Sequence, residues 1–191
     1  MPLHDVDGEV RNVQTIAADG TKLYLADAQK MGTFHLLGEL RPGTPVIVAE
    51  GYATGATVHC AAGLPVAVAL DTSNLMAVAT ALRDQDLARP IYMAADNDHL
   101  PVRATPLPNA GREKAEAAAA AVGGTVLLPE AVADQVAKGK GTDWNDYEAS
   151  QGRAATRAAL RTAGLQEQAA QDERLTARPR AAERQATGLN A

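Results

Sequence analysis

Acidic residues follow three short apolar runs of this chain. VIVAE ends at Glu50, VAVALD ends at Asp71, and IYMAAD ends at Asp96, with Asp98 two positions later. Continuous apolar runs of this length are typical of strands that are buried on both faces, as in a parallel sheet. Parallel strands place their carboxyl ends along one edge, and open α/β sheets bind ligands there. The sequence therefore predicts that several carboxylates converge on one crevice.

A cluster of carboxylates needs a counter-charge. Two like charges about 4 Å apart repel each other by about 4 kcal/mol at an effective dielectric constant of about 20. Protons or cations must therefore neutralise the cluster. Because sites made only of oxygen ligands select hard cations, we expect Mg²⁺ or Mn²⁺ as the cofactor.

The Asp96-Asn97-Asp98 segment is the strongest metal-binding candidate. Alternate residues of an extended segment point to the same side, so both carboxylates can face one cation. The competing interpretation is an Asx turn at the end of a strand. We favour a metal site because the neighbouring strands bring further acids to the same edge.

Glu50 and Asp143 are further candidates. Glu50 lies in AEGYATG, where it could be a general acid or base, a metal ligand, or an ordinary acid that interacts with a helix dipole. Both interpretations of Glu50 stay open. Asp143 lies in GTDWNDY and could bind metal or simply cap a helix, and we favour metal binding. We expect Trp144 to anchor this loop against the body.

Four basic residues are candidates for binding the phosphates of a substrate. Lys22 and Lys30 lie in the N-terminal segment, and Arg112 and Lys114 open the helix that is expected after the Asp96–Asp98 segment. Lysine and arginine bind triphosphates and backbone phosphates. A solvated helix face explains Arg112 and Lys114 equally well.

Composition excludes several classes of protein. The 191 residues are 46% hydrophobic but only 3% aromatic, and the formal net charge is -5. A free-standing DNA-binding module is usually basic, so tight unassisted binding through phosphates is disfavoured. Cys60 is the only cysteine, which excludes an intrachain disulfide and a cysteine-rich zinc module. Phosphate-binding-loop, dinucleotide-binding and nucleophile-elbow motifs are also missing.

Membrane association is not expected either. The start, MPLHDVDGEV, lacks the basic and apolar regions of a signal peptide, and no apolar run reaches membrane-spanning length. We therefore expect a cytoplasmic protein.

The candidate residues need a scaffold, and the pattern predicts one of α/β class. Expected strands alternate with expected helices, in the order 46–50, 56–62, 66–70, 75–85, 91–95, 111–122 and 125–130. This alternation predicts an open sheet of about four parallel strands with helices on both faces. A Gly/Lys-rich loop is expected over 131–150.

Shorter segments flank this body. We expect residues 1–44 to form a small β-rich subdomain, in which 9–16 and 21–27 pair as a hairpin with Gly20 in the turn. The α/β domain is expected to occupy 45–150. A short helix over 152–164 and a flexible tail complete the region 151–191.

These features together resemble a known family, the Toprim domain. The shared features are a Glu after the first strand, D-x-D after the third, and the alternating body. The resemblance is greatest to the Toprim primases of conjugative plasmids and integrative elements, the TraC-like group, in the segments AEGYATGATVHCAAGLPVAVALD, AADNDH, GREKAEAAAA and KGTDWNDYEA. The stretch GTKLYLADAQKMGTFHLLG also resembles the small subdomain that precedes Toprim in primases.

The resemblance implies a primase that makes RNA primers from ribonucleoside triphosphates on single-stranded DNA, in plasmid conjugation or mobile-element replication. Glu50 would act as acid or base or help to hold metal, and Asp96 and Asp98 would bind Mg²⁺ or Mn²⁺. Lys22 and Lys30 would contact nucleotide or template.

Departures from the family pattern leave alternatives open. Many primases carry a second acid four residues after the Glu, where this chain has Thr54. The chain shows neither a zinc-binding module nor a helicase domain. Three interpretations stay open: a fragment, a degraded gene, and a core whose zinc-binding or helicase partner is on another chain. A Toprim nuclease and a non-catalytic DNA-binding or interaction module remain the alternatives.

Overall fold

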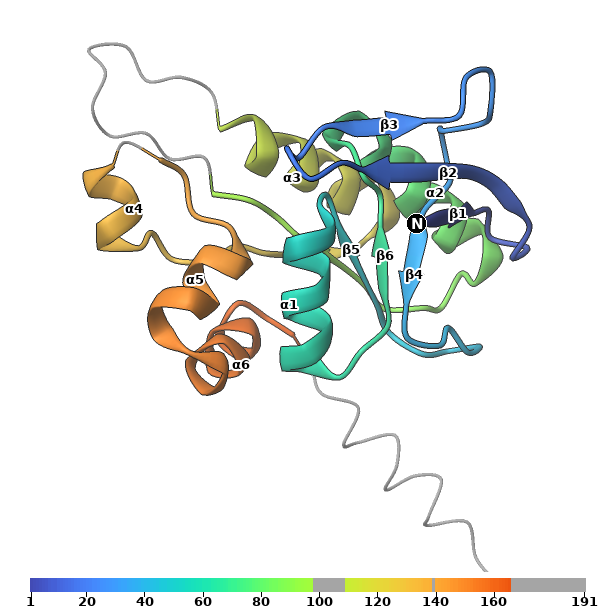
Figure 1. Cartoon of the computed structure of the whole chain (residues 1–191). Coiled ribbons are helices and arrows are strands. Elements are labelled where there is room, and N and C mark those ends of the chain that lie inside the picture. Colours follow the sequence, from blue (N-terminus) through green and yellow to red (C-terminus); the bar gives the residue numbers. More distant parts are fainter. Residues whose placement is uncertain (98–108, 139, 166–191) are drawn as a thin grey trace, which may run out of the picture.

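A five-stranded sheet forms the centre of the molecule (Figure 1). The computed structural model describes residues 1–97, 109–138 and 140–165. The strand order is β4-β6-β5-β7-β8. Their bounds are His35–Leu37 for β4, Val46–Ala49 for β5, Val66–Val68 for β6, Ile91–Ala94 for β7 and Thr125–Leu127 for β8. The predicted parallel strands β5 to β8 are confirmed, whereas β4, which pairs antiparallel with β6, was not anticipated.

Helices cover both faces of this sheet, as predicted (Figure 1). Successive side chains of a strand point to opposite faces. Val46 and Val48 accordingly pack with α2 (Leu75–Gln85) and α3 (Ala110–Val122). Ile47 and Ala49 pack on the other side, against a layer that contains α1 (Tyr52–Ala62), α5 (Trp144–Gln151) and α6 (Arg153–Thr162).

Helix α1 lies unusually close to the sheet. It begins at Tyr52, four residues earlier than the sequence predicted, with Gly51 as its N-cap. A Cβ atom added at Gly55 would lie 2.7 Å from Cγ2 of Val68, so only glycine permits this approach. The GYATG segment is therefore largely a helical packing surface that begins just beyond Glu50.

A smaller antiparallel sheet precedes the central one. It has the order β1-β2-β3, with bounds Pro2–His4, Val10–Ile16 and Lys22–Tyr24. The predicted hairpin of β2 and β3 is confirmed, and Gly20 in its turn has φ +85. His4 forms a β-bridge with Phe34, next to β4, so the two sheets are joined.

The region 131–150 is more helical than predicted. It contains α4 (Ala133–Ala137) and α5, where the sequence analysis expected a loop. Trp144 is fully buried, and its indole N–H donates to the carbonyl of Leu127 at 3.2 Å, which confirms the expected anchor. The predicted tail beyond residue 165 lies outside the described residues. No helix in the described ranges is both long and apolar enough to cross a membrane.

Candidate active site at the carboxyl edge of the sheet

Glu50 and Asp96 lie at the ends of two neighbouring parallel strands. Ala49 of β5 is opposite Ala94 of β7, Glu50 follows β5 directly, and Asp96 comes two residues after β7. Both acids are half-buried. The topology thus brings these candidates to one edge, whereas Asp98 lies outside the described residues.

A backbone bridge brings the GTDWNDY segment to the same edge. Asn97 and Thr142 exchange two N–H···O bonds of 2.9 Å, so Asp143 follows a residue that is paired directly with the D-x-D segment. The Asn97 side chain donates to the carbonyl of Pro129 and accepts from Asn109, both at 3.0 Å. Because side chains alternate along an extended segment, this fixes Asp96 on the other side of the chain.

Asp143 caps α5, which was the alternative interpretation of this residue. Its carboxylate accepts the backbone N–H of Asp146 at 2.6 Å and also bonds the hydroxyl of Thr54. Burial raises the pKa of Asp143, and these hydrogen bonds only partly offset that effect. Thr54 is buried on α1, at the position where the resemblance leads one to expect a second acid.

The carboxylates at this edge fit a hard divalent cation by their chemistry, because all of their donor atoms are oxygens. In the described ranges, however, no three Asp, Glu, His or Cys side chains lie together closely enough to hold a metal ion. Glu50, Asp96 and Asp143 therefore do not form a complete ligand set by themselves. A site centred on Glu50 and Asp96 would need Asp98 as well.

The basic candidates are spread over two elements and one loop. Lys22 is exposed on β3, and Lys114 is exposed on α3. Arg112 pairs with Glu116 at 2.7 Å on the surface of α3, a contact worth about 0.5 kcal/mol in general. Lys30 is different, because its ammonium lies 2.6 Å from the carboxylate of Asp71.

The sequence analysis named Asp71 but not its partner, and it did not single out Asn74. Asp71 follows β6 and was expected to add a charge to the acidic crevice, but Lys30 neutralises it. The side chain of Asn74 is buried and was not singled out. The Asp-Thr-Ser-Asn turn signal was visible in the sequence, but it contains no information about the distant partner.

Comparison with known proteins now decides the family. The family model described as the Toprim domain matches residues 45–154. The chain belongs to the Toprim family. Its Toprim domain is of the TraC-like type, as the resemblance indicated.

The Toprim chain is similar to two proteins of Escherichia coli that are both named DNA primase TraC. It is 41% identical to one over 132 residues and 42% identical to the other over 133 residues, which in each case is 68% of this chain. The aligned part is only 12% and 9% of these relatives, so the chain spans about a tenth of their length.

A solved structure supports the fold. The primase fragment of the bacteriophage T7 primase-helicase protein superposes with a TM-score of 0.56 and 16% sequence identity. The similarity covers 83% of this chain and 60% of that fragment. It extends beyond the Toprim match, because residues 45–154 are a smaller part of the chain than the superposed region.

Proposed function

We propose that this chain is the catalytic core of a DNA primase. It would join ribonucleoside triphosphates into RNA primers on a single-stranded DNA template in a metal-dependent reaction. The observation that carries the proposal is the 41% identity to a DNA primase TraC. The position of Glu50 and Asp96 after neighbouring parallel strands supports it, because carboxylates at one sheet edge suit the metal ions that assist phosphoryl transfer.

The acids at the carboxyl edge have distinct proposed roles. Glu50, Asp96 and Asp98 would hold Mg²⁺ or Mn²⁺, which when bound stabilises the attacking and leaving oxygens of phosphoryl transfer. Glu50 would also exchange a proton with a reacting group. Asp143 would hold the edge together through Thr54 and α5, in addition to any contact with metal.

The basic residues would bind the polyanionic substrates. Lys30 and Lys22 belong to the N-terminal segment and would contact nucleotide or template. Arg112 and Lys114 lie in the first turns of α3, shortly after the D-x-D segment, and would contact phosphates there. Lysine and arginine suit this role because their N–H groups donate charge-assisted hydrogen bonds to phosphate oxygens.

The biological setting that we propose is plasmid conjugation or the replication of a mobile element. A zinc-binding module on another chain would assist in template choice, and a helicase would be a second partner. This part of the proposal is supported by the names of the relatives, of which the chain spans only a tenth.

A primer-synthesis assay tests the function. Purified chain, single-stranded DNA template, labelled ribonucleoside triphosphates and Mn²⁺ should give short RNA products. Asp96→Asn and Glu50→Gln should each reduce the product by at least about a hundredfold, because each removes a charge that the reaction requires. Asp84→Asn, on the exposed face of α2, is the matched control and should leave synthesis unchanged.

Two results would redirect the proposal. Metal-dependent nicking of a labelled oligonucleotide without incorporation of nucleotides would indicate a Toprim nuclease. If no product forms and DNA binding is unaffected by Asp96→Asn, the chain would be a non-catalytic binding module.

A further inference from the structure

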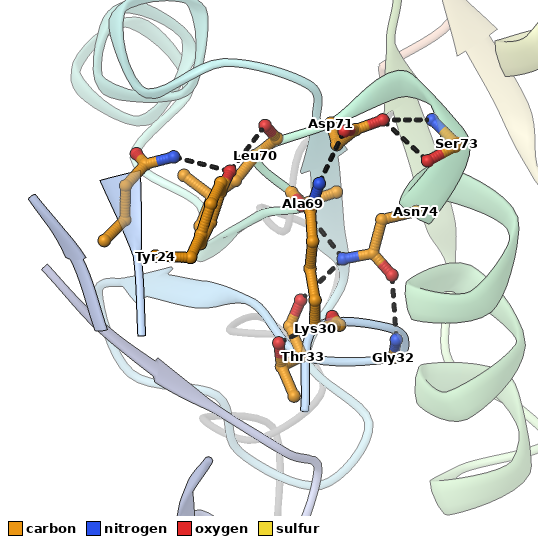
Figure 2. A network of polar contacts seen from close by, with 10 residues as sticks. Tyr24, Lys30, Gly32, Thr33, Ala69, Leu70, Asp71, Ser73 and Asn74 are labelled. Carbon is orange, nitrogen blue, oxygen red and sulfur yellow. Dashed lines mark hydrogen bonds and ion pairs between the residues drawn. The ribbon is translucent and has the colours of Figure 1, made fainter. Parts of the chain in front are cut away.

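The N-terminal segment is fastened to the loop between β6 and α2 by Lys30, Asp71 and Asn74, which we call the clasp (Figure 2). Lys30 Nζ lies 2.6 Å from Asp71 Oδ2 and 4.8 Å from the ring centre of Tyr24. The Tyr24 hydroxyl donates to the carbonyl of Leu70 at 3.2 Å. The ammonium is therefore held by a charge on one side and an aromatic face on another.

Asn74 makes the clasp rigid. Its side chain is buried, with 1% of the residue exposed. Its Oδ1 accepts the N–H of Gly32 at 2.8 Å, and its Nδ2 donates to the carbonyls of Thr33 and Ala69 at 2.9 Å each. One amide thus joins the segment that contains Lys30 to the end of β6. The two bonds that Asn74 donates are buried, and the bond that it accepts from Gly32 is partly buried.

Asp71 is fixed from its own side as well. Its Oδ1 accepts the N–H and the hydroxyl of Ser73 at 2.8 and 2.7 Å. The preceding Leu70 has φ +66, a conformation that is rare for leucine and that concentrates at functional sites. The Asp71 carboxylate is therefore held in position by contacts that do not involve Lys30.

The Lys30 ammonium remains open to a ligand. An ammonium has three N–H donors. The hydrogen bond to Asp71 uses one of them, and 35% of the Lys30 side chain is exposed. The clasp stands at the end of β6, which is the direct neighbour of β5 and hence of Glu50. We therefore expect a polyanion that binds at the carboxyl edge to approach Lys30 as well.

We propose that Asp71 is a positioning residue that holds the Lys30 ammonium for the phosphates of an incoming nucleoside triphosphate. This inference rests on the proposed function for the identity of its ligand. A mobile lysine side chain loses conformational entropy when it binds phosphate. The contact with Asp71 already restricts the Lys30 side chain, so less entropy is lost on binding. Loss of Asp71 should therefore weaken nucleotide binding by roughly two- to tenfold.

A double-mutant cycle tests the proposal with Mg·ATP binding to the full chain, measured by calorimetry. The variants are Asp71→Asn, Lys30→Met and both together, with Asp84→Asn as control. Asp71→Asn should weaken binding in the wild-type chain and have no effect in the Lys30→Met background, because it acts through Lys30. If Asp71→Asn does not fold, Asp71→Glu displaces the ammonium while keeping the charge, and it should weaken binding in the same Lys30-dependent way.

Three other outcomes would overturn the proposal that Asp71 positions Lys30. Equal losses in both backgrounds would mean a purely structural role for Asp71. Tighter binding by Asp71→Asn would mean that the carboxylate competes with phosphate for Lys30. Absence of ATP binding by the wild-type chain would also end it, whereas binding with the expected coupling but no primer synthesis would reject only the proposed function.

Discussion

Asn97 and Thr142 are joined by two antiparallel backbone hydrogen bonds, each 2.9 Å long. They connect the segment after β7 with the segment before α5, which are far apart in the chain. This bridge is the reason that Asp96 and Asp143 belong to one edge of the molecule. The candidate site therefore depends on backbone hydrogen bonds as well as on the acidic side chains.

Thr142 supports the bridge with its side chain, which predicts a stability effect. The residue is 2% exposed, and its hydroxyl accepts the N–H of Val132 at 3.1 Å. Thr142→Val keeps the shape but leaves that buried N–H without an acceptor, so the free energy of unfolding should fall by about 1–3 kcal/mol. Urea unfolding measures the loss, and Thr142→Ser, which keeps the hydroxyl, should lose clearly less.

We expect the Asn74→Asp substitution to lower the free energy of unfolding more than Thr142→Val does. Asn74→Asp keeps one acceptor for Gly32 but sets an oxygen against the carbonyls of Thr33 and Ala69. The free energy of unfolding at pH 7 should fall by about 3 kcal/mol or more, because a buried charge then lacks donors. Asn74→Ala should cost less than Asn74→Asp and should remove the hydrogen-exchange protection of the Gly32 amide. Equal stability of Asn74→Asp and wild type would contradict the geometry of the clasp.

The Lys30–Asp71 pair predicts a dependence of stability on pH. The hydrogen bond from Lys30, followed by those from Ser73, lowers the pKa of Asp71 to about 2. An acid whose pKa is lower in the folded state stabilises that state above its ordinary pKa, and the benefit is lost as the pH falls towards the folded value. Since the pair is about one-third exposed, we expect about 1 kcal/mol rather than the full value of the shift.

Urea unfolding of wild type and Asp71→Asn between pH 6 and pH 2.5 measures this contribution. The difference in free energy of unfolding should be about 1 kcal/mol at pH 6 and should shrink below pH 4. When Lys30 is replaced by Met, the effect of Asp71→Asn on the free energy of unfolding should be smaller at pH 6. A difference that stays constant with pH would show that the carboxylate charge contributes nothing.

Local signals explain why much of the scaffold could be predicted from sequence. The parallel strands β5, β6 and β7 are continuous apolar runs. Glycine follows the helices, as at Gly63 and Gly123, where φ is positive. Strand β4 escaped prediction because it has only three residues and no alternating pattern. Helix α5 also escaped, because it is polar and short, and the burial of Trp144 stabilises it rather than its helix propensity.

The candidate site also has features that could be predicted from the sequence and features that could not. The placement of Glu50 and Asp96 after neighbouring strands follows from parallel topology alone, so the sequence could predict it. The pairing of Lys30 with Asp71 spans 41 residues and depends on how the N-terminal segment folds back, for which no local pattern exists. No local pattern predicts the contact of Thr54 with Asp143 either, because the two residues are 89 positions apart in the sequence.

That last contact predicts the effect of restoring the second acid of the family pattern. Thr54 is 2% exposed and bonds the Asp143 carboxylate, whose pKa burial already raises. Thr54→Asp would bury two neighbouring carboxylates, so the free energy of unfolding at pH 7 should fall by about 2–4 kcal/mol. Because acids with raised pKa values destabilise the folded state as the pH rises, the loss should be smaller near pH 4 than at pH 7.

Substitution of Asp143 distinguishes repulsion between the two carboxylates from steric overpacking at position 54. Asp143→Asn alone should be close to neutral at pH 7, since Asn is as good an N-cap as Asp and carries no charge to desolvate. Combined with Thr54→Asp it should recover most of the lost stability, giving a coupling energy of at least about 1 kcal/mol in a double-mutant cycle. Additive losses would mean that steric strain at α1, rather than the meeting of two carboxylates, determines what position 54 tolerates.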